Sequence, residues 1–164
     1  MKPNAKTIAI VASVAVMLIF GVVLATEIPG PPATDLRLAP ELSFSDDSSP
    51  NFPIEGKNLS DGAVATDHAT VIFFGTANCW NTAREAERLV QLYPQYKDRI
   101  RFVVVDLRNP SVAQRALIAR YYHGYIPTIA VIDRNGNVLY DRAGETANER
   151  GDTSNLQKLL DSAR

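Results

Sequence analysis

Short apolar runs alternate with helix-like segments over residues 71–163. The run from Val71 to Phe74 ends at Gly75, as is typical of a buried strand. Apolar residues then recur at helical spacing over 80–97. Because strands that alternate with helices lie parallel in one sheet, this order predicts an α/β domain.

The rest of the domain follows from the same two periodicities. Further strands are predicted at 100–105, 128–132 and 138–141, and further helices at 111–122 and 155–163. Pro110 suits the first turn of the second helix. The Asn135-Gly136 pair predicts a hairpin between the last two strands. A hairpin joins antiparallel strands, so the predicted central sheet is mixed.

The N-terminal residues 7–25 form an uninterrupted stretch of 19 residues without a charge. A helix needs about 20 apolar residues to cross a bilayer core, whereas the apolar core of a secretory signal spans about 7–15 residues. The length therefore predicts a single transmembrane anchor. The small-residue sequence before Thr26 leaves an alternative, in which the chain is cleaved near Ala25 and secreted.

The charges beside this segment set its orientation. The basic region 1–6 contains Lys2 and Lys6, and acids follow residue 25. Positive charge marks the cytoplasmic side. The N-terminus is therefore expected in the cytoplasm and the remainder outside it, which is the periplasm in a Gram-negative cell.

Residues 26–53 are rich in proline and acidic side chains. Such a composition favours an extended, partly stiff tether rather than a packed core. The sequence therefore predicts a linker over 26–53 and a globular domain over 54–164.

Composition excludes several function classes. The formal net charge is −1 and no basic block exists, so nucleic-acid binding is not expected. One cysteine cannot form a disulfide within the chain, and two distant histidines do not give a zinc spacing. Neither a metal nor a cofactor is expected.

Two stretches resemble the thioredoxin family. VIFFGTANCWNTAREAERL is similar to its active-site strand and helix, with Cys79 at the first position of the Cys-x-x-Cys motif. RYYHGYIPTIAVIDRNGNVLYDRAGE is similar to its second signature, with Pro127 at the cis proline and Gly144 at a later glycine. The resemblance implies a thioredoxin-like three-layer fold with a central mixed sheet flanked by helices, here preceded by one transmembrane helix. Membrane-anchored bacterial thioredoxin domain proteins are similar in layout.

The chain departs from the family pattern around the cysteine. Thr82 stands in place of the second cysteine, Phe73 in place of a buried acid, and Asn78 in place of a tryptophan. A resolving thiol normally breaks the mixed disulfide. Thr82 has no sulfur, so a dithiol cycle within one chain is excluded.

The predicted site centres on Cys79 as the candidate nucleophile. A helix N-terminus favours a thiolate, which is the reactive form, and the Thr82 hydroxyl is placed to donate a hydrogen bond to it. The resemblance implies that Ile126, Pro127 and Thr128 frame the sulfur and bind an extended substrate peptide. Substrate binding would also involve Trp80, inside the motif.

The sequence is compatible with three hypotheses for the function of this site. The first is monothiol thiol–disulfide exchange through Cys79, with protein thiols or disulfides or a small thiol outside the cytoplasm; as an enzyme it would be a thiol–disulfide oxidoreductase. The second is a redox-inactive module that docks partner peptides beside the cis proline. The third is oxidation of Cys79 by a peroxide, although the family's peroxidases place Thr or Ser before the cysteine. A Cys79-linked homodimer is compatible with an oxidising compartment.

Two expectations concern side chains outside the motif. Arg84 and Arg88 are predicted to lie on the solvent face of the helix over 80–97. His123 is predicted to be packed and neutral, because it aligns with a core position of the family.

Overall fold

A computed structural model describes residues 35–57, 59, 64–65, 67–141 and 151–163. Its main sheet contains four strands in the order β4-β3-β5-β6. These are β3 (Ala69–Gly75), β4 (Ile100–Asp106), β5 (Thr128–Ile132) and β6 (Val138–Asp141). β3 runs parallel to β4 and antiparallel to β5, and β5 and β6 form a hairpin. The mixed sheet predicted from the sequence is confirmed.

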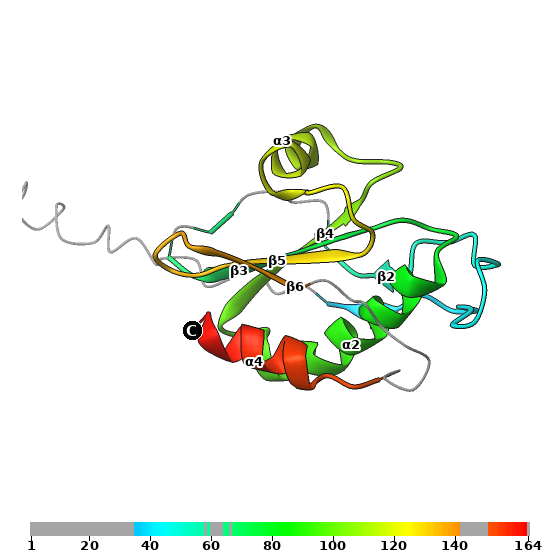
Figure 1. Cartoon of the computed structure of the whole chain (residues 1–164), viewed down its shortest axis with the longest axis horizontal. Coiled ribbons are helices and arrows are strands. Elements are labelled where there is room, and N and C mark those ends of the chain that lie inside the picture. The colour runs from blue at the N-terminus through cyan, green and yellow to red at the C-terminus, as the bar shows by residue number, and fades with distance from the viewer. Residues whose placement is uncertain (1–34, 58, 60–63, 66, 142–150, 164) are drawn as a thin grey trace, which may run out of the picture.

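Three helices cover the two faces of this sheet. α2 (Trp80–Tyr96) and α4 (Ser154–Ser162) lie on one face and α3 (Val112–Tyr121) on the other (Figure 1). The alternation of side chains along β3 divides the core accordingly. Val71 and Phe73 pack toward α2 and α4, whereas Ile72 and Phe74 pack toward α3.

The ends of the helices follow local sequence signals. α3 begins with a capping box, in which the Ser111 hydroxyl accepts from Gln114 N and the Gln114 side chain accepts from Ser111 N.

The hairpin loop after β5 closes with Gly136 at a φ of 81°. Asp133 O accepts from Gly136 N at 3.0 Å, so a tight turn is followed by one glycine in the left-handed region.

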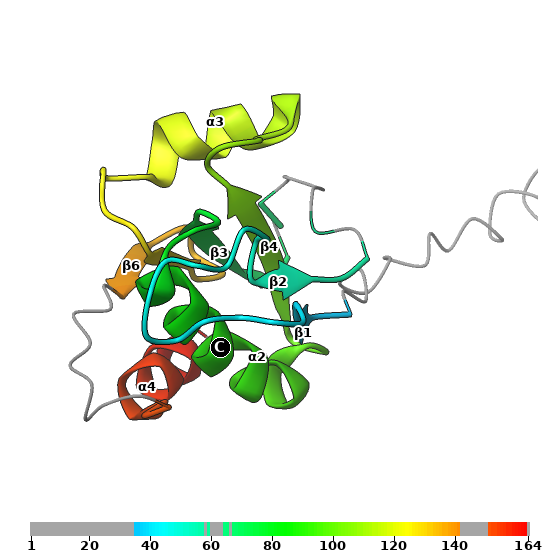
Figure 2. The ribbon, with the colours of Figure 1, turned by 90° about the vertical axis from the view of Figure 1, so that its right-hand side faces the viewer.

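The N-terminal part of the described chain packs on the domain. β1 (Arg37–Leu38) pairs antiparallel with β2 (Ile54–Glu55), and the neighbouring Leu36 is only 6% exposed. Residues 39–53, called the strap below, connect the two strands and pass across the start of α2 (Figure 2). The predicted linker is therefore wrong from residue 35 onward, because sparse apolar residues such as Leu36 find partners in the core.

The arrangement of strands and helices fits the thioredoxin-like fold that the resemblance implies. The expected transmembrane segment 7–25 and Gly144 lie outside the described residues. None of the helices in the described part of the chain combines the length and apolar character that a membrane crossing requires.

Candidate functional site

The carboxyl end of β3 and the start of β5 meet at one edge of the sheet. Phe74 of β3 pairs with Thr128 of β5. The turn that leads to Cys79 and the proline loop that ends at Thr128 therefore lie at this edge. The peptide bond between Ile126 and Pro127 is cis, as the resemblance implies.

Cys79 is the N-cap residue of α2. Its backbone is extended, with φ −148° and ψ 106°, and its carbonyl accepts from Ala83 N at 3.1 Å. Its side chain makes no capping hydrogen bond, and the residue is partly exposed. Asn78 turns the chain into this position with a φ of 53°, a conformation that asparagine tolerates better than most residues.

The turn before Cys79 is tied to two other segments. Asn78 N donates to Ser49 O of the strap at 2.8 Å. With its amide oriented by the hydrogen-bond network, the Asn78 side chain also donates to Ser49 O, at 2.8 Å, and accepts from Arg108 Nη1 at 3.2 Å. Asn78 thus connects the strap to the segment after β4 through its backbone and side chain.

The strap also occupies the first turn of α2. The Asp47 carboxylate accepts a hydrogen bond from Trp80 N at 2.9 Å. A side chain remote in sequence therefore caps the helix where Cys79 leaves an N–H group open. Beside it, the pKa of Asp46 is lowered by hydrogen bonds from Ser48 and then Ser43. No sequence signal marks Asp47 as part of the site, because residues 26–53 read as linker.

Arg84 joins the strap to the indole ring of Trp80. Its Nε donates to Phe44 O at 2.8 Å, and its guanidinium carbon lies 4.1 Å from the centre of the Trp80 ring. Arg84 and Arg88 are each 8% exposed, so the prediction that they face solvent is wrong. The strap covers Arg84, and Arg88 forms a 2.9 Å ion pair with buried Glu85.

Thr82 lies beneath the turn that precedes Cys79. It is fully buried, and its Oγ1 accepts a 3.5 Å hydrogen bond from Thr76 N. Its methyl group packs against Gly75, because a Cβ added at Gly75 would lie 2.4 Å from Thr82 Cγ2. In the described part of the chain its hydroxyl bonds to Thr76 N, and no hydrogen bond joins it to Cys79.

The proline loop presents apolar side chains at the same edge. Tyr125 is 52% exposed and Ile126 41% exposed, whereas Pro127 and Thr128 are buried. Thr128 Oγ1 donates to Tyr125 O at 2.6 Å and fixes the loop. Tyr125, Ile126 and Pro127 are called the docking ledge below. The partly buried Trp80 lies at the start of α2, near the same sheet edge.

His123 differs from its prediction. It is exposed, and its ring meets Tyr140 edge-on with 4.5 Å between ring centres. The segment between α3 and β5 leaves the core before residue 123, so this side chain contacts Tyr140 at the surface and not the core. Among the described residues no cluster of His, Cys, Asp or Glu could hold a metal ion.

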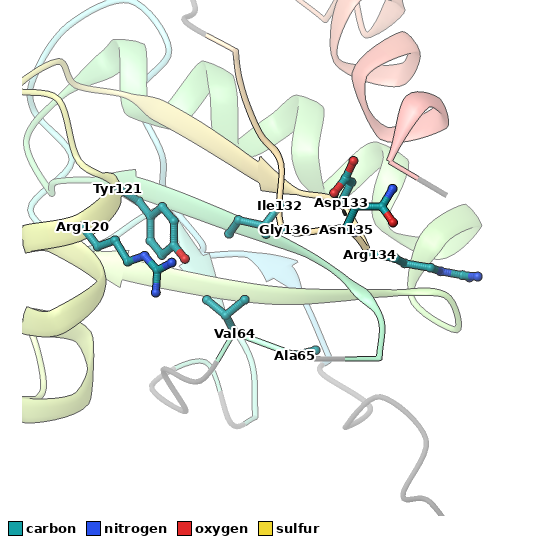
Figure 3. A pocket seen from close by; sticks show the side chains of 9 residues that line it. All are labelled: Val64, Ala65, Arg120, Tyr121, Ile132, Asp133, Arg134, Asn135 and Gly136. Atoms are coloured by element: carbon teal, nitrogen blue, oxygen red, sulfur yellow. Dashed lines mark hydrogen bonds between the residues drawn. The ribbon is translucent and has the colours of Figure 1, made fainter.

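A pocket of about 390 Å³ lies at the opposite end of β5. Arg120 and Tyr121 reach it from α3, and the β5–β6 hairpin closes the other side (Figure 3). Hydrogen bonding, first from the Asn137 side chain, lowers the pKa of Asp133 in this hairpin. The pocket is separate from the edge that holds Cys79.

Comparisons with known proteins give matches among solved structures. No protein-family model and no curated protein matches the chain. One solved structure, of a malarial protein, shares 18% identity with a TM-score of 0.45 over 58% of this chain and 97% of that one. Oxidised mitochondrial thioredoxin 3 from Saccharomyces cerevisiae shares 18% identity with a TM-score of 0.43 over 58% and 79%. Neither similarity assigns a role to a residue of this chain.

Proposed function

We propose that this protein is a membrane-tethered, extracytoplasmic thioredoxin-like protein that exchanges disulfides through the single thiol of Cys79. The observation that carries the proposal is the position of the partly exposed Cys79 at the N-cap of α2, at the sheet edge that also holds cis Pro127. The exposed Ile126 beside it offers an apolar contact to an extended partner segment.

The proposed exchange needs a small thiol from outside the chain. The Cys79 thiolate attacks one sulfur of a partner disulfide, forms a mixed disulfide, and releases the other partner sulfur as a thiolate that takes up a proton. The thiolate of the small thiol then attacks the partner sulfur of the mixed disulfide. Cys79 leaves as a thiolate, and the partner keeps one free thiol and one disulfide to the small thiol.

Trapping of mixed disulfides in intact cells tests this exchange. Cells that produce the full chain or Cys79→Ser are treated with acid and a thiol-blocking reagent, and adducts are separated without reductant. We expect partner adducts with the unchanged chain and none with Cys79→Ser. Absence of partner adducts with the unchanged chain, or a homodimer linked through Cys79 as its sole product, would contradict exchange with partners.

The tether is a separate part of the proposal. Residues 7–25 would anchor the chain with its N-terminus in the cytoplasm. Alkaline extraction of membranes should leave the full chain in the pellet, and protease added outside the cytoplasmic membrane should digest the domain. Release of a shortened soluble chain would favour cleavage near Ala25 instead.

A second candidate function is peptide docking without exchange. Two hydrogen bonds favour it. Trp80 N donates to the Asp47 carboxylate, and the Thr82 hydroxyl accepts from Thr76 N, so neither Trp80 N nor the Thr82 hydroxyl is directed at a Cys79 thiolate. Partner capture in pull-downs should then survive Cys79→Ser and fall with Ile126→Asp, which places a charge on the docking ledge. Loss of every partner in Cys79→Ser would exclude docking alone.

A further inference from the structure

We infer that Asp47 restrains the reactivity of Cys79: while the strap lies on α2, its carboxylate occupies the helix start and opposes a second negative charge there. The inference concerns regulation of the thiol in the proposed exchange, and its biological role rests on that proposal. Asp47 acts on Cys79 through position and charge and takes no part in bond making, so it is a positioning residue.

The bonds between Cys79 and Trp80 keep the Cys79 sulfur close to the Asp47 carboxylate. Asp47 Oδ1 lies 2.9 Å from Trp80 N, and that nitrogen is bonded to the carbonyl carbon of Cys79. Sγ is four bonds from the same nitrogen, so ordinary bond lengths place Sγ and Oδ1 no more than about 8 Å apart. The carboxylate is therefore within the distance over which a charge affects ionisation of a thiol at ordinary salt.

The helix start stabilises one anion better than two. Its open N–H groups and the positive end of the helix dipole favour a negative charge at the first turn. Asp47 already takes the N–H group of Trp80 and contributes a full charge. A nearby like charge disfavours ionisation of an acid, so the fraction of Cys79 present as thiolate should rise when the charge at position 47 is removed.

Among the described residues, no charged side chain forms an ion pair with Asp47. Among the described residues, the ion pairs within 4.0 Å join Arg37 to Glu55, His68 to Asp67, and Arg88 to Glu85. None includes Asp47. The titratable or charged groups on the neighbouring segments are Asp46 in the strap, Arg84 in α2, Asp106 and Arg108 at the end of β4, and His123 and Tyr125 in the loop before β5.

The contacts of the strap decide where the Asp47 carboxylate lies. Phe44 O on one side is held by Arg84 Nε, and Ser49 O on the other by Asn78 N. Arg84 is 8% exposed, and its Nη1 has no hydrogen-bond partner in the described structure. Arg84 Nη1 therefore has no hydrogen-bond acceptor among the described residues while the strap lies on α2. A partner that displaces the strap would free Trp80 N for the thiolate.

Alkylation of the single cysteine tests the restraint without any partner. The full chain, purified in a neutral detergent, is treated with iodoacetamide across a pH series, and modification of Cys79 is followed by mass spectrometry. Asp47→Asn keeps an acceptor oxygen for Trp80 N but removes the charge. Asp46→Asn is the matched control, because Asp46 lies in the same strap but bonds to Ser48 N.

We expect Asp47→Asn to react about 3- to 10-fold faster than the unchanged chain at pH 7 and low salt, from a charge about 8 Å away in a medium between water and protein. The rate profile should move to lower pH, and added salt should reduce the difference. Asp46→Asn should stay within about twofold of the unchanged chain, because its carboxylate bonds to Ser48 N within the strap and not to the start of α2.

A rate for Asp47→Asn equal to or below that of the unchanged chain would overturn the inference. An increase seen in Asp47→Ala but not in Asp47→Asn would also overturn it, since the cause would then be loss of the hydrogen bond and not of the charge. Circular dichroism checks that each variant is folded. If trapping finds no partner adducts but Asp47→Asn reacts faster, the restraint stands and the proposed exchange fails.

Discussion

Gly75 ends β3 where the Thr82 methyl group packs against the strand. A Cβ at this position would lie 2.4 Å from Thr82 Cγ2 and 3.0 Å from the Phe73 ring. We expect Gly75→Ala to lower the free energy of unfolding by about 1–3 kcal/mol, as overpacking of a dense core does. Urea unfolding followed by circular dichroism measures this change.

A double variant separates the clash from other effects of the new methyl group. Thr82→Ser removes Cγ2 and keeps the hydroxyl that accepts from Thr76 N. In the Thr82→Ser background, Gly75→Ala should cost less than in the unchanged chain, because residues in contact are coupled. Equal costs in both backgrounds would show that the Thr82 methyl group is not the obstacle.

Position 82 also tests whether the scaffold still supports dithiol chemistry. Residues 79 and 82 are three positions apart at the start of a helix and therefore lie on one face. We expect Thr82→Cys to gain insulin reduction in the presence of a small reductant, because it supplies the resolving thiol that the chain lacks. Thr82→Ser should gain none, and activity in that control would point to reduction without a resolving sulfur.

The structural role of a single residue was predictable where a local sequence pattern indicates it. The N-cap position of Cys79 and the cis bond before Pro127 follow from the two stretches that resemble the thioredoxin family. The capping contact of Asp47 does not, because it joins residues 33 positions apart. The burial of Arg84 depends on the same strap, and hydropathy alone places an arginine in solvent.

Among the helices, α3 depends most visibly on its cap. Ser111 and Gln114 satisfy each other's backbone N–H groups, and Gln114 Nε2 also donates to Val104 O at 2.8 Å. We expect Ser111→Ala to lower the free energy of unfolding by about 1 kcal/mol, as loss of an N-cap does. Urea unfolding measures the change.

Gln114→Ala removes the bond from Ser111 N together with the tertiary bond to β4 and serves as the comparison for Ser111→Ala. Gln114 is 4% exposed and links α3 to β4. Its removal leaves a buried carbonyl with one partner fewer, so it should cost about 1–3 kcal/mol. A larger loss for Ser111→Ala than for Gln114→Ala would mean that the cap, and not the bond to β4, fixes the helix.

Elements with a strong period were predictable and short paired elements were not. The limits of β5 and β6 agree with the sequence prediction residue for residue, whereas β3 begins two residues earlier and ends one later, and β4 ends one residue later. β1 and β2 have two residues each, too few for an alternation to be seen. Their pairing comes from burial of Leu36 and Ile54 on α2, which only the tertiary structure supplies.

At the scale of the whole molecule, the strap changes where the domain begins. It closes over the first turn of α2, so the segment read as a tether belongs to the site. The three-layer arrangement itself follows from the order of strands and helices. The same order does not specify what covers the edge that holds Cys79, because proline-rich segments carry no periodic signal.

The free energy of unfolding should fall in acid because of four aspartates in different parts of the domain. Four aspartates have a pKa below the ordinary 3.8, each mainly through hydrogen bonds to its carboxylate: Asp46, Asp67, Asp133 and Asp152. A lowered pKa in the folded state means that the unfolded chain binds more protons near pH 4. These groups therefore stabilise the fold above about pH 4, and that stability is lost as the pH falls through their folded pKa values.

Asp133 provides the sharpest test of this acid effect. Its carboxylate accepts from Asn135 N, Asn137 N and Asn137 Nδ2, each at 2.8 Å, and so holds the β5–β6 hairpin. Asp133→Asn keeps an acceptor oxygen but removes the titrating group. In urea unfolding from pH 7 to pH 3, its free energy of unfolding should fall less steeply below about pH 4 than that of the unchanged chain. Parallel curves would mean that the hairpin carboxylate contributes nothing to acid sensitivity, and that the loss comes from the other three aspartates or from general charge repulsion.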